Sequence, residues 1–111
     1  MKEISYRDFL NVELRVGKII RAQDFPKANK PAYKLWIDFG PVGVKRASAQ
    51  ITKLYSKNDL LERKIIAVVN FPPKQVADFM SEVLVLGVVL EDGAVSLLSI
   101  EHDVPLGAKV L

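Results

Sequence analysis

Two apolar runs, at residues 64–69 and 83–90, constrain the fold of this chain more than any other feature. Both are apolar at successive positions, which is typical of strands buried on both faces. Pro72 and Pro73 end the first run, because proline has no N–H to donate to a strand ladder. The sequence therefore predicts two buried strands joined by a crossover that begins at a pair of prolines.

The crossover itself has the spacing of a short helix. Val76, Phe79 and Met80 recur at i, i+3 and i+4, and the fixed φ of proline suits a first helical turn. We therefore expect residues 74–80 to be helical. A polar crossover held between two buried strands would present its side chains rigidly to a ligand.

Three earlier runs alternate with a period of two, at residues 12–23, 33–39 and 45–50. Gly17, inside the first run, predicts a bulge or a sharp bend of the kind that a small barrel needs at its corner. In the third run Ala47 and Ala49 suit a crowded interior. We expect Arg46, Ser48 and Gln50 to face outward from that run.

Short helical segments interrupt the strands. Ser5 and Asp8 form a capping-box pattern, which predicts a helical turn over residues 5–10 with Tyr6, Phe9 and Leu10 facing inward. Residues 51–63 are rich in turns, with Asn58 as the candidate cap of a turn that ends at residue 61.

Five short strands, a glycine in the first and a turn segment after the third indicate an all-β OB-type Greek-key barrel with short helices. The 111 residues form a single domain. A hairpin at residues 91–93 leading into 95–100, together with the tail at 104–110, covers part of the apolar outer faces. A second copy of the chain, as a two-fold homodimer, accounts for the remainder; a monomer closed by its own tail is the alternative.

Charge is distributed unevenly along the chain. Fifteen of the 16 Lys and Arg residues lie at or before Lys74, with seven of the 13 Asp and Glu residues. A basic first part predicts an anionic partner, and ordinary solvated surface charge is the alternative.

The composition argues against catalysis and cofactor binding. There is no cysteine, and His102 is the single histidine, so we expect no disulfide and no metal centre. Ser81 and Glu82 have no histidine nearby to act as a base. No phosphate loop, signal sequence or bilayer-spanning run is present. We therefore expect a cytoplasmic protein that is not an enzyme, holds no cofactor and does not insert into a membrane.

Three aromatic residues are candidate ligand contacts. Trp36 shares a strand face with Lys34, a pattern that favours stacking of a nucleic-acid base beside a cation. Packing against a second copy or the tail is the alternative for Trp36. Phe71 and Phe79 are candidates to line a groove for an apolar peptide side chain, with core packing as the alternative.

Polar and basic residues of the same region could converge beside the barrel. Donors of this kind suit phosphates, 2′-hydroxyls or an extended peptide backbone. A turn or cap role is the alternative for Asn70. The candidates are Lys45, Arg46, Ser48, Gln50, Asn70, Lys74, Gln75 and Ser81.

Residues 12–19, 25–40 and 48–51 resemble the tRNA-binding-domain family, and residues 31–40, 70–73 and 79–87 are similar to its CsaA branch of secretion-related chaperones. The resemblance extends from residue 6 to residue 111. It implies an OB fold, a homodimer sealed by the chain ends, and binding of tRNA through shape and phosphate contacts. Its alternative implication is binding of unfolded export precursors in the same groove.

The chain differs from the tRNA-binding relatives at Gln75, where they carry lysine, and at residues 77–78, where they carry Arg-Gly. Lys34, Lys45 and Arg46 are the residues available to replace that lost charge.

Overall fold

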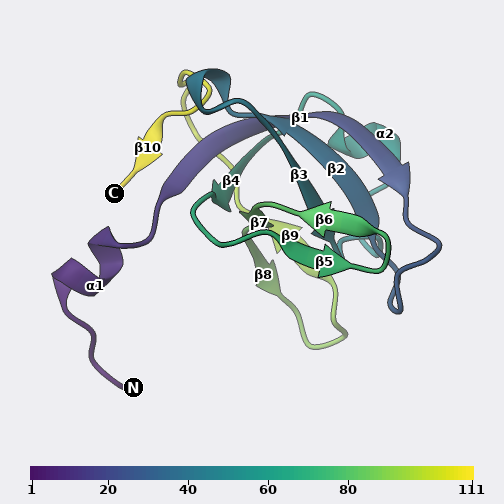
Figure 1. The fold of residues 1–111 in the computed structure, drawn as a ribbon, viewed down its shortest axis with the longest axis horizontal. Helices are drawn as coiled ribbons and strands as arrows, with labels where there is room; N and C mark the ends of the chain where they lie inside the picture. Colours follow the sequence, from purple (N-terminus) through teal and green to yellow (C-terminus); the bar gives the residue numbers. More distant parts are fainter.

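The computed structural model describes all residues 1–111 and contains an open five-stranded antiparallel barrel (Figure 1). The hydrogen-bonded order is β3-β2-β1-β4-β7, which confirms the predicted OB-type barrel. The end strands β3 and β7 are not hydrogen-bonded to each other, so the barrel has a seam. The barrel strands are β1 (Leu14–Asp24), β2 (Tyr33–Asp38), β3 (Val44–Ala49), β4 (Lys64–Val68) and β7 (Leu84–Val85).

The remaining elements decorate this barrel. Strands β5 and β6 form one hairpin, β8 and β9 form another, and β10 pairs with the start of β1. Neither α-helix has the length and apolar character needed to cross a bilayer. These elements are α1 (Tyr6–Leu10), η1 (Gly40–Val42), α2 (Lys57–Leu60), β5 (Lys74–Val76), β6 (Phe79–Ser81), β8 (Gly87–Val89), β9 (Val95–Leu97) and β10 (Lys109–Val110).

The core follows from the period-two pattern of the second strand. Leu35, Ile37 and Phe39 lie on one face of the β2 segment and are fully buried. They face Ala47 of β3 and Ile65 of β4, which are also fully buried in the same cluster. The predicted inward alanines of β3 are confirmed, and small residues there leave room for the large side chains of β2.

The predicted helix over residues 74–80 is wrong, because this segment is the β5–β6 hairpin. Val76 pairs with Phe79 across a two-residue turn of Ala77 and Asp78, and Ala77 adopts a φ of 51°. A spacing of three residues joins neighbours in a helix, but it also joins the closing pair of such a hairpin. Burial of Phe79 against aromatic residues of the barrel stabilises the hairpin.

The predicted strand over residues 83–90 divides into two strands. β7 pairs with β4, and β8 then pairs with β9 around the turn expected at residues 91–93. Glycine at position 87 allows the chain to leave β4 and pair with β9. Any other residue there would place its Cβ only 2.5 Å from Val95 Cγ1. The outer face of β8 stays uncovered in a single chain, with Val89 72% exposed.

The irregularity of β1 lies three residues beyond the predicted site. Gly17 pairs regularly with Ile65 of β4, whereas the register to β2 shifts between Ile19 and Arg21. Gly17 is required for packing instead. A Cβ at this position would lie 2.6 Å from both Ile37 Cγ2 and Phe39 Cε1.

The N-terminal helix stands off the barrel (Figure 1). Its capping box is confirmed: Ser5 Oγ accepts from the Asp8 N–H at 3.0 Å, and an Asp8 carboxylate oxygen accepts from the Ser5 N–H at 3.1 Å. The predicted inward orientation is wrong within one chain for Tyr6, which is 70% exposed, and for Leu10, which is also exposed, whereas Phe9 is half-buried. The second helix is capped by Ser56 rather than Asn58.

Substitution of Gly17 by alanine tests the packing of β1 on β2. We expect Gly17→Ala to lower the free energy of unfolding by about 1–3 kcal/mol, because the new methyl group overlaps two buried side chains. Val44→Ala, at an exposed position of β3, should change it by less than about 0.5 kcal/mol. Urea denaturation measures both, and equal stability of the two variants would contradict the packing described here.

Candidate nucleic-acid interface

The outer face of β1, β2 and β3 places Trp36 between two arginines. The cross-strand register sets Arg21 opposite Trp36 on one side and Arg46 opposite it on the other. The Arg21 guanidinium carbon lies 4.6 Å from the centroid of the Trp36 ring, within cation–π range. Lys34, two residues before Trp36 on β2, extends from the same face. None of Arg21, Lys34 or Trp36 belongs to the buried core.

The β5–β6 hairpin partly covers this face through Phe79. The Phe79 ring lies 5.8 Å from Trp36 and 5.6 Å from Phe25, both edge to face. Lys34 Nζ and the Arg46 guanidinium lie 5.6 and 5.4 Å from the same ring. Phe79 therefore has the core-packing role, and Trp36 packs against its own hairpin rather than the C-terminal tail. Trp36 remains half-buried.

The hairpin is fastened to the edge of β3 by its C-terminal end. The Ser48 N–H donates to Ser81 Oγ at 3.0 Å, and the Glu82 N–H donates to the Arg46 carbonyl at 2.8 Å. Glu82 Oε1 accepts from the Arg46 N–H at 3.0 Å and from Arg46 Nε at 3.4 Å. Ser81 and Glu82 are thus structural residues. The terminal nitrogens of Arg46 have no partner and remain available to a ligand.

The tip of the hairpin is fastened to the β1–β2 loop by an ion pair between Lys27 Nζ and Asp78 Oδ2 at 3.1 Å. The hydrogen bond from Lys27, with its positive charge, lowers the pKa of Asp78 below its ordinary value of 3.8. Asp78 therefore stays ionised and paired at neutral pH.

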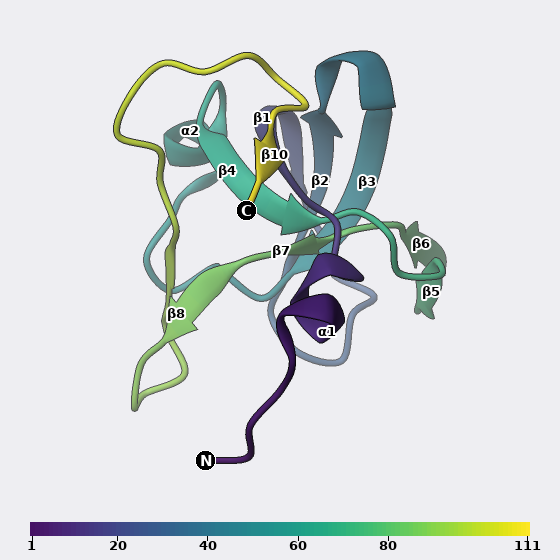
Figure 2. The same cartoon turned by 90° about the vertical axis from the view of Figure 1, so that its left-hand side faces the viewer.

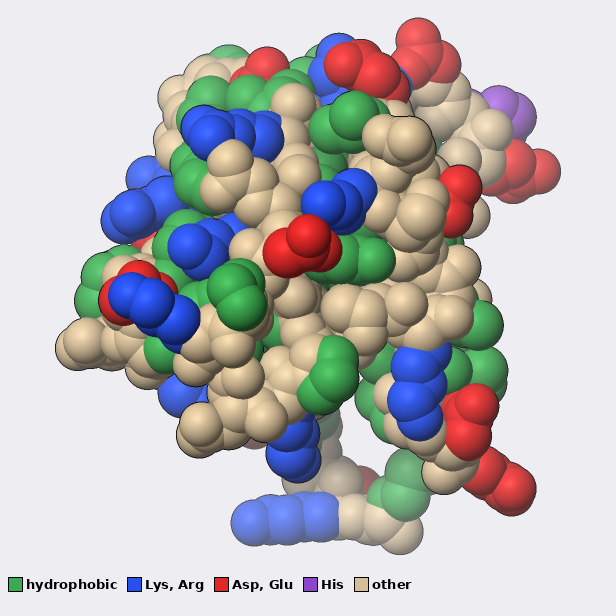
Figure 3. All heavy atoms as spheres, turned by 90° about the vertical axis from the view of Figure 1, so that its right-hand side faces the viewer, with side chains coloured by type: hydrophobic (Ala, Val, Ile, Leu, Met, Phe, Trp, Pro, Cys, Tyr) green, Lys and Arg blue, Asp and Glu red, His purple; other side chains and the backbone are tan.

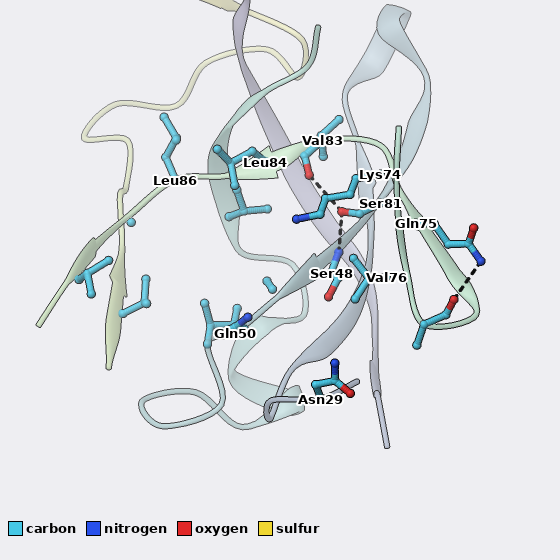
Figure 4. A pocket seen from close by; sticks show the side chains of 17 residues that line it. Asn29, Ser48, Gln50, Lys74, Gln75, Val76, Ser81, Val83, Leu84 and Leu86 are labelled. Carbon is cyan, nitrogen blue, oxygen red and sulfur yellow. Dashed lines mark hydrogen bonds between the residues drawn. The ribbon is translucent and has the colours of Figure 1, made fainter. Parts of the chain in front are cut away.

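A groove of about 680 Å³ lies beside this face, between the hairpin, the end of β3 and the β7–β9 segment (Figure 4). Five predicted site residues line it. Gln75 turns away from the groove and donates from Nε2 to the Ala77 carbonyl at 3.1 Å (Figure 4). The five residues are Ser48, Gln50, Lys74, Gln75 and Ser81.

Three predicted site residues lie elsewhere. Asn70 has a structural role: its Nδ2 donates to the Asn11 carbonyl at 2.8 Å, and its Oδ1 accepts from the Glu13 N–H at 3.0 Å. Phe71 is 53% exposed and lines an adjoining apolar pocket, which shares Lys74, Ser81, Val83 and Leu84 with the groove. Lys45 alternates with Arg46 along β3 and so belongs to the opposite face of the strand.

Sequence reasoning missed Arg21. Strict alternation from Val12 places Arg21 on the face of Glu13 and Arg15, but it does not give the cross-strand register that sets Arg21 opposite Trp36 after the shift between Ile19 and Arg21. The sequence predicts the bulge at Gly17, whereas the register shift lies between Ile19 and Arg21. The only sequence signal was a basic residue near the end of a strand that carries the apolar pattern.

Residues 14–109 match the profile of a family described as a putative tRNA binding domain. The chain belongs to this family. It is 37% identical over 108 residues to the methionine–tRNA ligase of Thermococcus onnurineus, which covers 96% of the chain and 14% of that ligase. It is 35% identical over 109 residues to methionine–tRNA ligase 1 of Bacillus anthracis, covering 98% of the chain and 16% of the ligase. The chain thus spans only a small part of the length of these curated relatives.

Solved structures of similar length match this chain closely. Chaperone CsaA of Bacillus anthracis superimposes with a TM-score of 0.95 at 50% identity, covering 99% of this chain and 100% of that one. CsaA chaperone protein of Picrophilus torridus gives 0.91 at 54% identity, with 98% and 100% covered. A MetRS-related protein of Pyrococcus horikoshii gives 0.89 at 28% identity, with both chains covered completely.

Basic side chains gather on one side of the molecule. Figure 3 shows Lys and Arg concentrated on the half nearer the β5–β6 hairpin, and most Asp and Glu along the top and right margins. Arg21, Lys34 and Lys74 form none of the six ion pairs of the chain. This surface therefore carries cations that no ion pair of the chain holds.

Removal of the Lys27 ammonium tests the contact at the hairpin tip. We expect Lys27→Met to raise the pKa of Asp78 toward 3.8, since the hydrogen bond that stabilises the carboxylate is lost. The lowered pKa of wild-type Asp78 stabilises the folded chain above pH 3.8, and this contribution disappears as the pH falls through the folded value.

NMR titration of the side-chain carboxyl carbons measures this change. Asp59 is the internal control, because hydrogen bonds from Ser56 lower its pKa and Lys27 is not among the causes. An Asp78 titration that is the same in wild type and Lys27→Met would show that the ion pair does not form in solution.

Proposed function

We propose that this chain is a non-catalytic tRNA-binding protein of CsaA type, which acts in the cytoplasm and holds folded RNA on a homodimer by shape and phosphate contacts. The observation that carries this proposal is the row of Arg21, Trp36 and Arg46 across three strands, with Lys34 beside it. The family match and the methionine–tRNA ligase relatives support tRNA as the RNA.

The chemistry of this face suits a phosphate backbone with an unstacked base. Arginine guanidinium groups pair with phosphate oxygens in a forked geometry, and lysine supplies a further positive charge. The exposed ring surface of Trp36 offers a place on which a base of a single-stranded loop stacks. Cations that pair with phosphates position an RNA without reading its bases, which favours recognition of RNA shape over recognition of sequence.

Exposed apolar residues support the homodimer. Ile4, Tyr6 and Leu10 on the N-terminal segment are exposed together with Val89 and Leu111. Figure 1 shows that α1 and the C-terminus lie at the same end of the molecule, and this end faces the viewer in Figure 2. A second copy seated on this end would bury Ile4, Tyr6, Leu10 and Leu111 and give the dimer two RNA-binding faces.

Charge reversal at the two free cations tests the RNA-binding face. We expect Arg21→Glu with Lys34→Glu to abolish binding of unfractionated tRNA, because phosphates would then meet like charge. If Arg21, Lys34 and Arg46 each neutralise one phosphate, the wild-type affinity falls about 20- to 40-fold for a fourfold rise in salt. Fluorescence anisotropy with labelled tRNA measures both effects.

Lys53→Glu with Lys109→Glu is the matched control, since it changes the net charge equally away from this face. Lys53 lies beside the β8–β9 turn, and Lys109 lies on β10. Equal loss of RNA binding in the two double variants would show that the change in net charge alone weakens binding. That result would remove the support for this face.

Charges on α1 test the homodimer. We expect Tyr6→Glu with Leu10→Glu to convert a dimer to a monomer, because two carboxylates would be buried in the interface. Both side chains are exposed in one chain, so the folded monomer should keep its stability. Light scattering coupled to gel filtration measures the mass. A wild-type chain that is monomeric at high concentration would refute the dimer.

A second function is favoured by the groove beside the hairpin. Its apolar lining suits an unfolded chain, so we propose that the protein also acts as a chaperone that binds unfolded export precursors. The similarity to CsaA structures supports this second function. Titration with an unfolded preprotein and with tRNA, each at low and high salt, separates the two, since only RNA binding should weaken steeply with salt.

A further inference from the structure

The groove lies at the open seam of the barrel, where two strand edges lack partners. β3 and β7 end the hydrogen-bonded order, and residues of both line the groove. In most small barrels such edges are paired or covered, because a free edge offers backbone donors and acceptors to any extended chain. Here the hairpin region bonds only to the Arg46 backbone and to the Ser48 N–H, and leaves the Ser48 carbonyl free.

The free groups of β3 can be assigned individually. The Ser48 N–H bonds to Ser81 Oγ, so the Ser48 backbone faces away from β2, and its carbonyl points to the same side. No hydrogen bond outside the strand ladders ends on the Ser48 carbonyl, and the Gln50 N–H has no acceptor. The alternation of β3 directs the Gln50 N–H to the side of the Ser48 carbonyl.

The opposite edge is also unpaired. The Leu86 N–H donates to the Ile66 carbonyl at 2.9 Å, so positions 84 and 86 face β4. Val85 between them directs its N–H and carbonyl away from β4, toward the seam. Both sides of the groove thus carry unused backbone hydrogen-bonding groups.

The side chains of the groove select a peptide rather than an RNA. One wall is apolar, and Lys74 is the single charged residue of the lining. A phosphate backbone requires several cations along its path, which this groove lacks. An extended segment with apolar side chains satisfies both the apolar wall and the free strand edge. The apolar wall consists of Val83, Leu84, Leu86, Val89 and Val95.

We propose that an extended apolar segment of a partner protein adds as a strand along the free end of β3, bonding to the Ser48 carbonyl and the Gln50 N–H while its apolar side chains contact the Leu84–Leu86 wall. This inference rests on the second proposed function and assigns its mode of recognition. Because the main chain supplies the bonds, the site accepts many sequences, and it is separate from the Trp36 face.

Removal of one backbone N–H tests strand addition. Gln50→Pro deletes the donor without breaking a bond of the free protein, and Ala49 already has the extended backbone that a following proline requires. Gln50→Ala keeps the N–H and is the matched control. We expect Gln50→Pro to weaken binding of a short fluorescein-labelled Leu-Ser repeat peptide at least about tenfold relative to Gln50→Ala.

Peptide N-methylation tests the same bonds on the wild-type protein and does not depend on how the variants fold. Two isomers of the peptide, each methylated at alternate residues, differ only in which side of the strand loses its N–H groups. We expect one isomer to lose binding and the other to keep it. Thermal unfolding of Gln50→Pro establishes whether that variant is folded.

The outcomes distinguish a failure of strand addition from a failure of the chaperone function. If wild type binds the peptide, but both methylated isomers bind equally well and Gln50→Pro matches Gln50→Ala, strand addition is wrong while the chaperone function stands. If wild type binds neither this peptide nor an unfolded preprotein, the second function fails, and strand addition fails with it.

Discussion

The alternation of side chains along β2 determines most of this structure. Burial of Leu35, Ile37 and Phe39 holds β2 between β1 and β3, and the same alternation forces Lys34 and Trp36 onto the opposite face. Apolar burial thus positions the polar residues indirectly. Gly17 is part of the same constraint, because the barrel closes around Ile37 and Phe39 only where β1 has no side chain.

The β5–β6 hairpin divides the surface beside this core into two sites of different chemistry. On one side Phe79 supports Trp36 and lies near the cations Lys34 and Arg46, which produces a basic aromatic face. On the other side the hairpin forms one wall of the seam groove, where apolar residues and free backbone groups dominate. One three-residue strand pair therefore separates a surface suited to phosphates from a groove suited to extended peptide.

The strands and the fold class could be predicted from the sequence, because period-two burial depends only on local alternation. The hairpin could not, since a spacing of three residues from Val76 to Phe79 fits both a helix and a two-residue turn. The position of Arg21 depends on a register shift that no residue marks. The groove depends on which strand ends stay unpaired, and this is a property of the closed fold rather than of any local segment.

The central claim is that the outer face of β1, β2 and β3 holds RNA. The most direct measurement is a titration of ¹⁵N-labelled protein with unfractionated tRNA, followed by NMR through the Trp36 indole N–H and the backbone amides. Our account predicts that the largest shifts occur at Trp36 and at residues next to Arg21 and Lys34. Shifts confined to β8, β9 and β10, with an unchanged Trp36 indole signal, would contradict it.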